Sequence, residues 1–258
     1  MDTTLDTRAL AEKVQRMYRQ VAENPSGDFH FELGEQLALR VGYDPTELAA
    51  VPPPAVESFA GVGFFFDLAG LDRGETVLDL GSGSGMDAFY AARLIGASGR
   101  VIGIDFTPEQ IDKSRRLARE AGLTQVEFHT ARIERLPLAD ETVDCAISNG
   151  VINLSADKAA VFAEASRVLR PGGRLAIADI VSETQLVDSI VCNADLWASC
   201  IGGAAQEEAY LAAIEANGFT VREVRPNPYE FLSEQARNAA KVYGVKSISV
   251  LAVKEEQQ

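Results

Sequence analysis

The stretch that decides the fold is Val77-Leu78-Asp79-Leu80-Gly81-Ser82-Gly83-Ser84-Gly85. Its apolar start is typical of a buried strand, and its alternate glycines lead into a helix predicted over Met86–Leu94. Glycine allows backbone conformations that a Cβ forbids, and it lets a ligand lie against bare main chain. Unpaired N–H groups also point outward where a helix begins. The stretch therefore predicts a loop that binds a nucleotide-like cofactor.

The spacing of the glycines discriminates between two kinds of cofactor. A dinucleotide fingerprint, G-x-G-x-x-G, would place its third glycine at position 86, where the chain has Met86. Here an acid, Asp79, precedes the turn instead, and a carboxylate suits a cationic amine better than a pyrophosphate. We expect Asp79 to bind the cofactor together with the loop residues Gly81, Ser82, Gly83 and Gly85.

A second acid fits the first. The β-branched run Arg100–Asp105 follows the intervening helix and ends in Asp105, with Phe106 next. In a βαβ unit such an acid reaches ribose hydroxyls, and Phe106 is placed to lie against a flat base. Thr107 and Pro108 already offer an N-cap and a first helical residue, so Asp105 is not needed for capping. We therefore expect Asp105 and Phe106 to be cofactor residues.

From Leu71 to Val181 these residues resemble the class I, Rossmann-like S-adenosylmethionine-dependent methyltransferases. The glycine loop resembles that family's first motif and Ile104-Asp105 its second. Three further stretches follow in the family's order: Glu134–Leu138, Val143–Asn149 and Val168–Leu175. The resemblance implies an α/β fold with a doubly wound, mostly parallel sheet of seven strands that ends in an antiparallel pair. It also implies S-adenosylmethionine as cofactor, S-adenosylhomocysteine as product and a small-molecule methyl acceptor.

Within that superfamily, Ser148–Leu154 and Leu196–Ala204 resemble segments of the arsenite methyltransferases. Those enzymes hold trivalent arsenic between cysteine thiolates, which suit a soft centre. Two of the family's cysteines align here with Gly150 and Ala60, and only Cys200 is retained. One thiolate does not clamp arsenic as two or three do. The resemblance therefore predicts the cofactor but not arsenite as an efficient substrate.

Three further residues are expected at the cofactor. Between the third and fourth predicted strands, Arg132 aligns with the acid that contacts adenine in the family. Backbone groups of Arg132 and Ile133 remain able to bind the edge of adenine. Asn149, which ends the fourth motif, completes the expected cofactor set.

The chain falls into three zones. We expect a helical lid over 1–70, a cofactor-binding core over 71–181, and over 182–258 a segment covering the substrate together with the last strands. Strands are predicted near 76–80, 100–105, 126–129, 143–147, 174–180, 219–224 and 245–253. Helices are predicted around 10–21, 34–41, 108–121, 157–169, 206–216 and 233–242, and a stiff proline run at 52–54.

The lid, the segment after the fourth strand and the third zone should converge above the transferred methyl. Their chemistry-bearing residues are the candidate catalytic or acceptor-site residues: Tyr18, His30, Asn153, Trp197 and Cys200. None of them is an unambiguous general base. A base is needed only where the acceptor is protonated, and soft acceptors such as thiolates need none. His30, which lies between aromatic residues, is more typical of a core or capping histidine than of a catalyst. Cys200, beside a glycine pair, is as compatible with a structural role as with a substrate role.

The composition agrees with a soluble enzyme. The formal net charge is −14, which argues against nucleic acid and anionic membranes as partners. No apolar run approaches the roughly 20 residues that span a bilayer, and the first residues do not resemble a signal peptide. The 3 cysteines lack metal-site spacing, so no metal is expected, and they suggest reduced thiols in a cytoplasm. A monomer and a homodimer are both compatible with the sequence.

Two other classes of function compete with a methyltransferase. A short-chain oxidoreductase needs a tyrosine followed four residues later by a lysine, whereas Tyr243 has Lys246 at three. Asp79 and Met86 also favour the sulfonium cofactor over a dinucleotide. A cofactor-binding protein without catalytic activity stays open, and only a turnover measurement separates it from an enzyme.

Overall fold

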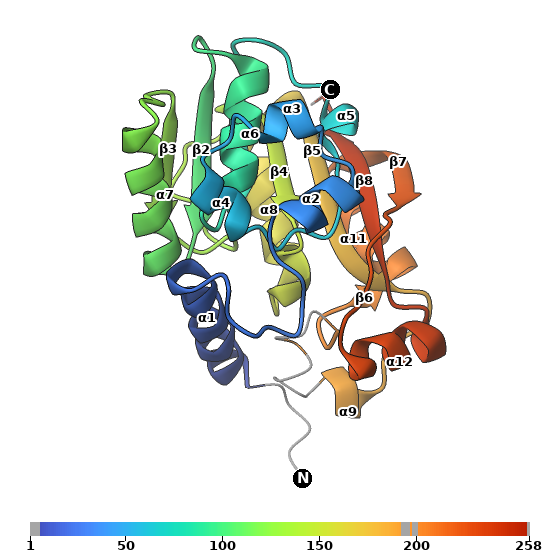
Figure 1. The fold of residues 1–258 in the computed structure, drawn as a ribbon. Coiled ribbons are helices and arrows are strands. Elements are labelled where there is room, and N and C mark those ends of the chain that lie inside the picture. Colours follow the sequence, from blue (N-terminus) through green and yellow to red (C-terminus); the bar gives the residue numbers. More distant parts are fainter. Residues whose placement is uncertain (1–5, 192–196, 198–200, 257–258) are drawn as a thin grey trace.

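The computed structural model describes residues 6–191, 197 and 201–256. Its centre is one sheet, with strand order β3-β2-β1-β4-β5-β8-β7 and the short strand β6 paired to β5 (Figure 1). The strands are β1 Thr76–Leu80, β2 Arg100–Asp105, β3 Val126–Thr130, β4 Val143–Asn149, β5 Leu169–Ser182, β6 Ala205–Gln206, β7 Phe219–Pro226 and β8 Lys246–Lys254. The five strands from β3 to β5 run parallel, and β8 lies antiparallel between β5 and β7.

Helices cover both faces of the sheet (Figure 1). They are α1 Thr7–Glu23, α2 Glu35–Val41, α3 Pro45–Leu48, α4 Pro53–Glu57, α5 Phe66–Ala69, α6 Met86–Ile95, α7 Pro108–Glu120, the 3₁₀ turn η1 Ile152–Leu154, α8 Lys158–Val168, α9 Asp188–Val191, α11 Glu207–Glu215 and α12 Glu234–Tyr243. In the described part of the chain, none of them combines the length and apolarity needed to cross a bilayer.

The alternation of side chains along the central strands builds two cores. Val77 and Val101 face one side, where they join a cluster with residues of α6, α7 and the N-terminal helices. Leu78 and Ile102 face the other side and join a cluster with residues of α8 and α11, including Phe162. Because successive residues of a strand point to opposite faces, each central strand is buried on both sides. The predicted doubly wound, mostly parallel sheet with an antiparallel C-terminal pair is confirmed.

The structure adds detail that the sequence pattern did not predict. Strand β6 is an eighth, two-residue strand. Strand β5 begins at Leu169, which pairs with Val143, before the register shifts and pairing resumes at Arg174. The proline run at 52–54 leads into a short helix that was not predicted, because Pro53 is the first residue of α4. Proline is well suited to that position, because its missing N–H would have no partner inside the helix.

The N-terminal segment packs on the carboxyl edge of the sheet. Helix α1 is capped by Asp6, whose side chain accepts hydrogen bonds from the backbone N–H groups of Arg8 and Ala9. Its buried side chains include Leu10, Val14 and Val21, as an amphipathic helix requires. Helix α1 packs against α7 and lies below it in Figure 1. This position fits the predicted lid, and the boundaries of the three zones remain a prediction.

Candidate functional site

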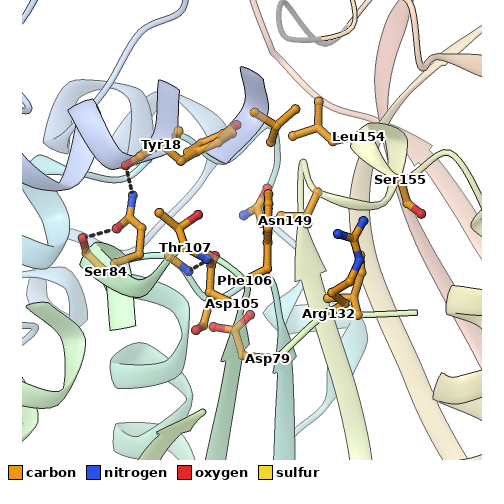
Figure 2. A pocket seen from close by; sticks show the side chains of 18 of the residues that line it. Tyr18, Asp79, Ser84, Asp105, Phe106, Thr107, Arg132, Asn149, Leu154 and Ser155 are labelled. Carbon is orange, nitrogen blue, oxygen red and sulfur yellow. Dashed lines mark hydrogen bonds between the residues drawn. The ribbon is translucent and has the colours of Figure 1, made fainter. Parts of the chain in front are cut away.

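A cavity of about 360 Å³ lies where the carboxyl ends of β1, β2 and β4 meet. This edge is the usual ligand site of an open α/β sheet, because the strand order reverses there. The loop after β1 and the acids Asp79 and Asp105 form one side, and α1 with Tyr18 forms the opposite side (Figure 2). The predicted cofactor loop and one candidate acceptor residue therefore line the same space.

The glycine loop folds as a tight turn held on β2. The N–H groups of Gly81 and Ser82 both donate to the carbonyl of Ile104, at 2.7 and 2.9 Å. Gly81 has a φ of 76°, and a Cβ there would meet Val151 at 2.4 Å. Gly81, Ser82 and Gly83 line the cavity as predicted.

Gly85 has a different place. It does not line the cavity but precedes α6 as its N-cap, with a φ of 94°. A Cβ on Gly85 would meet the rings of Phe128 and Phe89 at 2.8 Å. The residue therefore serves the packing of α6 on the sheet, and the structure does not bring it to the predicted cofactor contact.

Asp79 is the most informative acid of the site. Its residue is only 2% exposed, and its Oδ2 has no hydrogen-bond partner among the described residues. Burial, together with the nearby carboxylates Asp87 and Asp105, raises the pKa of Asp79 well above its usual range. Burying a carboxylate without a counter-charge is costly. This orphaned oxygen therefore fits a cavity built to receive a cationic group.

Asp105 is more tied into the protein than the sequence suggested. Its carboxylate accepts from the N–H of Thr107 at 2.8 Å and from the N–H of Gly83 at 3.1 Å. As expected, Thr107 is the N-cap residue of α7 and Pro108 its first helical residue, although the Thr107 hydroxyl makes no cap bond. Burial raises the pKa of Asp105, and these hydrogen bonds lower it. The carboxylate thus lines the cavity and fixes the glycine loop at once.

The predicted base-binding residues form a second wall. The guanidinium of Arg132 lies 5.7 Å from the centre of the Phe106 ring, a cation–π distance. Arg132 Nε lies 3.5 Å from a carboxylate oxygen of Glu134. Ile133 is 8% exposed and lines the same cavity. These side chains provide a flat, partly apolar surface, and in Figure 2 Phe106 lies between Asp105 and Arg132.

Asn149 lines the cavity, but its amide is used within the protein. Its Oδ1 accepts from the N–H groups of Val62 and Gly63 at 2.7 and 3.3 Å. Its Nδ2 donates to the Gly63 carbonyl at 3.0 Å, and to Tyr43 Oη and Asp87 Oδ2, each at 3.1 Å. Asn149 therefore joins the N-terminal segment to the core, beyond the cofactor contact predicted for it.

Asp87 is a site residue that the sequence reasoning missed. It lies in the first turn of α6, is 6% exposed and lines the cavity beside Asp79. Burial raises its pKa to about 6, against hydrogen bonds donated by Tyr43 and Asn149. The signal in the sequence was an acid directly after Met86, the residue that replaces the third Rossmann glycine.

Gln110 was also missed. It is 1% exposed, and its Nε2 donates to the backbone carbonyl of Tyr18 at 2.8 Å. The hydroxyl of Ser84 donates to Gln110 Oε1 at 2.5 Å. Figure 2 shows these two bonds bridging the glycine loop and α1. A second link is made by Gln15, which donates to the Phe106 carbonyl at 3.0 Å.

Of the five candidate acceptor residues, Tyr18 lines the cavity. His30 does not line it, and its ring meets the ring of Phe31 edge-on at 4.8 Å. Asn153 and Trp197 are 0% and 5% exposed and pack behind the cavity wall. Cys200 lies outside the described residues. The structure therefore separates the five residues that the sequence grouped together.

The topology and the site together define a Rossmann-like protein that binds a nucleoside cofactor bearing a cationic group. A family model described as a methyltransferase domain matches residues 71–218. The chain therefore belongs to the methyltransferase-domain family, whose cofactor is S-adenosylmethionine, and it is related to the arsenite methyltransferases.

Three comparisons specify this relationship. The chain is similar to an arsenite methyltransferase of Halobacterium salinarum, with 41% identity over 197 residues, 76% of this chain and 50% of that protein. It is also similar to the structure of an arsenic(III) S-adenosylmethionine methyltransferase from Chlamydomonas reinhardtii, with a TM-score of 0.64 and 29% identity over 87% of this chain and 75% of that chain. A geranyl diphosphate C-methyltransferase from Streptomyces coelicolor A3(2) shares the fold, with a TM-score of 0.70 and 18% identity over 95% and 98% of the two chains. The chain spans about half the length of the Halobacterium relative.

Proposed function

We propose that this protein transfers the methyl group of S-adenosylmethionine to a small organic acceptor with an apolar body, and that arsenite is at best a poor substrate. The observation that carries the cofactor half is the buried, orphaned carboxylate oxygen of Asp79. The observation that carries the acceptor half is the apolar character of the cavity wall opposite that acid.

The residues of the cavity fit the cofactor part by part. Asp79, supported by Asp87, would hold the cationic amine, and Asp105 would hold the ribose hydroxyls. Phe106 and Arg132, with Ile133, would enclose the adenine. When bound, the cofactor supplies an electrophilic methyl on a positively charged sulfur, which leaves as a neutral thioether. These side chains therefore have to bind and orient the cofactor, and correct positioning contributes up to about 7–11 kcal/mol in ideal cases.

The acceptor side is built from side chains of α1, the segment after α4 and η1. Its lining is mostly apolar: Leu10, Val14, Tyr18, Phe59, Ala60 and Leu154. An apolar wall excludes water from the transferred methyl and gains about 25 cal/mol for each Å² of apolar acceptor surface that it buries. Tyr18 is the lining residue with a hydroxyl that could meet a polar end of the acceptor.

Gly150 and Ala60 align with two cysteines of the arsenite methyltransferases, and their positions support the proposal that arsenite is a poor substrate. A Cβ placed on Gly150 would lie 3.8 Å from the Ala60 carbonyl oxygen, so these two positions are neighbours in space. Two thiols there would approach one arsenic atom, whereas glycine and alanine offer no sulfur. Cys200 alone would leave arsenic with a single thiolate. The alternative, a true metalloid methyltransferase using Cys200, is favoured only by the names of the relatives.

Calorimetry tests the cofactor assignment. The Asp79→Ala variant should bind S-adenosylmethionine about 10- to 100-fold more weakly, because a charge-assisted hydrogen bond contributes roughly 1.5–3 kcal/mol. The exposed Asp72→Ala variant is the control and should bind as the wild type does. Unchanged affinity in Asp79→Ala would remove the basis of the assignment.

Turnover tests the acceptor. We expect S-adenosylhomocysteine to form with apolar phenols, thiols or carbon acids and hardly at all with arsenite. The Ala60→Cys/Gly150→Cys variant should gain arsenite methylation, and Ala60→Ser/Gly150→Ser should not. The serine pair carries the same strain at Gly150, whose φ is 72°, without the sulfur. Efficient arsenite turnover by the wild type would contradict the proposal, and cofactor binding without turnover on any acceptor would indicate a non-catalytic binding protein.

A further inference from the structure

A partly buried lysine lies behind the acceptor wall, at the first position of α8. The ammonium of Lys158 donates to the carbonyl oxygens of Asn153 and Ser155, at 3.2 and 2.9 Å. It also lies 4.9 Å from the centre of the Trp197 ring. A single ammonium thus joins η1 to the C-terminal zone, and the site described above leaves this group without a role.

The surroundings of Lys158 contain a second buried charge. Asp179, near the end of β5, is 1% exposed and accepts from Tyr210 Oη of α11 at 2.7 Å. Asp179 is the charged group that acts on Lys158 among the described residues, and it favours the ammonium form. Burial acts against that form and lowers the pKa of Lys158 to about 8. Lys158 therefore carries its charge at neutral pH and loses it under mildly alkaline conditions.

The backbone packs tightly at the same place. A Cβ on Gly203 would meet the Asn153 carbonyl oxygen at 1.9 Å, and a Cβ on Gly202 would meet the Trp197 ring at 2.3 Å. The Gly202-Gly203 pair therefore lets the C-terminal zone rest directly on η1. Leu154 and Ser155, at the end of η1, line the cavity. Lys158 and Trp197 thus support the wall that faces the acceptor from behind.

We propose that Lys158 is a positioning residue that fixes Trp197 of the C-terminal zone onto the 153–155 turn and so holds the acceptor wall of the cavity in place. The ammonium is suited to this task because two carbonyls and an indole face receive it from different elements. The consequence for the acceptor rests on the proposed function, whereas the contact between Lys158 and Trp197 does not.

The chain contains a single tryptophan, so its fluorescence reports this contact directly. In Lys158→Met, which keeps the length of the side chain without its charge, we expect a shifted emission maximum and at least a twofold increase in acrylamide quenching. Lys158→Arg should restore much of the wild-type signal, because a guanidinium also stacks on an indole. The wild-type emission should change in a step near pH 8 that is missing from Lys158→Met.

Lys254 provides a matched control. It is also a buried lysine, 8% exposed, with its ammonium donating to the Leu169 carbonyl at 2.8 Å. Lys254→Met should reduce the thermal stability without altering the emission, the quenching or the pH step of Trp197. The comparison separates the contact from the general effect of removing a buried lysine.

Hydrogen exchange tests the effect on the wall. Residues 152–156 and 201–204 should exchange at least tenfold faster in Lys158→Met than in the wild type, and those of β1 and β2 should be unchanged. S-adenosylhomocysteine affinity, measured by calorimetry, should stay within twofold of wild type. If Lys158→Met has the same emission, quenching and hydrogen-exchange rates as the wild type, the proposal is wrong. If the wild type does not bind S-adenosylhomocysteine, the proposed function is contradicted, but the fluorescence comparison still tests the contact between Lys158 and Trp197.

Discussion

The backbone N–H of Gly83 lies 3.1 Å from a carboxylate oxygen of Asp105, so the acid at the end of β2 holds the cofactor loop of β1. The other carboxylate oxygen accepts from the N–H of Thr107 at 2.8 Å. One side chain therefore has two tasks: it shapes the loop in the free protein and offers oxygen to a ribose in the complex. Each task makes a separate prediction for a substitution.

Asp105→Ala should weaken S-adenosylmethionine binding about 10- to 100-fold and reduce the free energy of unfolding by roughly 1–3 kcal/mol, because two backbone donors lose their acceptor. Asp105→Asn keeps one acceptor oxygen and should lose affinity with a smaller change in stability. Calorimetry and urea unfolding measure the two effects. Equal stability of Asp105→Ala and the wild type would show that the loop does not depend on this carboxylate.

Gly83 and Gly122 form a matched pair for the glycine loop. Both have a positive φ, 50° and 67°, and Gly122 lies after α7 with open space around a Cβ. Valine at either position should cost about 1–2 kcal/mol of stability from backbone strain. Only Gly83→Val should abolish or strongly weaken cofactor binding, because its side chain would enter the cavity. Similar affinities of the two variants in calorimetry would contradict the assignment of the loop.

Gln110 links the glycine loop to α1 through Ser84 and the Tyr18 carbonyl. Gln110→Ala should lower the free energy of unfolding by about 1–3 kcal/mol, because the buried Ser84 hydroxyl loses its acceptor and α1 loses this link to the glycine loop. Proteolysis should then cut within α1 faster than in the wild type. Arg8→Ala removes an exposed pair with Glu12 on the same helix and should cost less than about 0.5 kcal/mol. An equal effect of the two variants would refute a special role for Gln110.

The acids of the cavity predict proton release on cofactor binding. In the folded protein the pKa of Asp87 is raised from its ordinary value of 3.8 to about 6. The protonated Asp87 therefore stabilises the fold fully below pH 3.8, and this contribution is lost as the pH rises through 6. A cationic ligand beside Asp87 and Asp79 favours the ionised carboxylates, so binding at pH 6 should expel protons.

Calorimetry in two buffers of different ionisation enthalpy measures this release. We expect between about half a proton and one proton per S-adenosylmethionine at pH 6, and less at pH 8. Asp87→Asn should reduce the release without removing all of it, since Asp79 remains. Identical binding heats in both buffers at pH 6 would show that neither acid changes its protonation.

The sheet was predictable from the sequence because its signals are local. Apolar runs, glycines at alternate positions and an acid at the end of each of two strands placed β1, β2 and the cofactor edge within a few residues. Burial of these strands on both faces follows from their continuous apolar character. Local signals did not define every detail. Pro53 begins a short helix, and Thr107, the N-cap residue of α7, makes no cap bond with its hydroxyl, while its N–H donates to Asp105.

The rest of the site depends on contacts between distant parts of the chain. Asp87 is hydrogen-bonded to Tyr43, and Gln110 is hydrogen-bonded to the carbonyl of Tyr18. In each pair the two residues lie far apart in the sequence. Asn153 and Trp197 do not line the cavity, and Lys158 contacts both of them behind its wall. Periodicity and motif spacing carry no information about such pairings, so the acceptor side could not be predicted with the detail of the cofactor side.

The amide of Asn149 has a consequence for how the protein reaches its native state. It joins the end of β4 to Gly63 and Tyr43, residues 86 and 106 positions earlier in the chain. Contacts of such long sequence separation form late, because closing a large loop costs chain entropy before the contacts can stabilise the fold. A fragment beginning at residue 71 would have the motifs of the family but would lack the partners that complete its pocket. During synthesis the N-terminal segment with Tyr43 and Gly63 is made first, and it can make these hydrogen bonds only after Asn149 has been added to the chain.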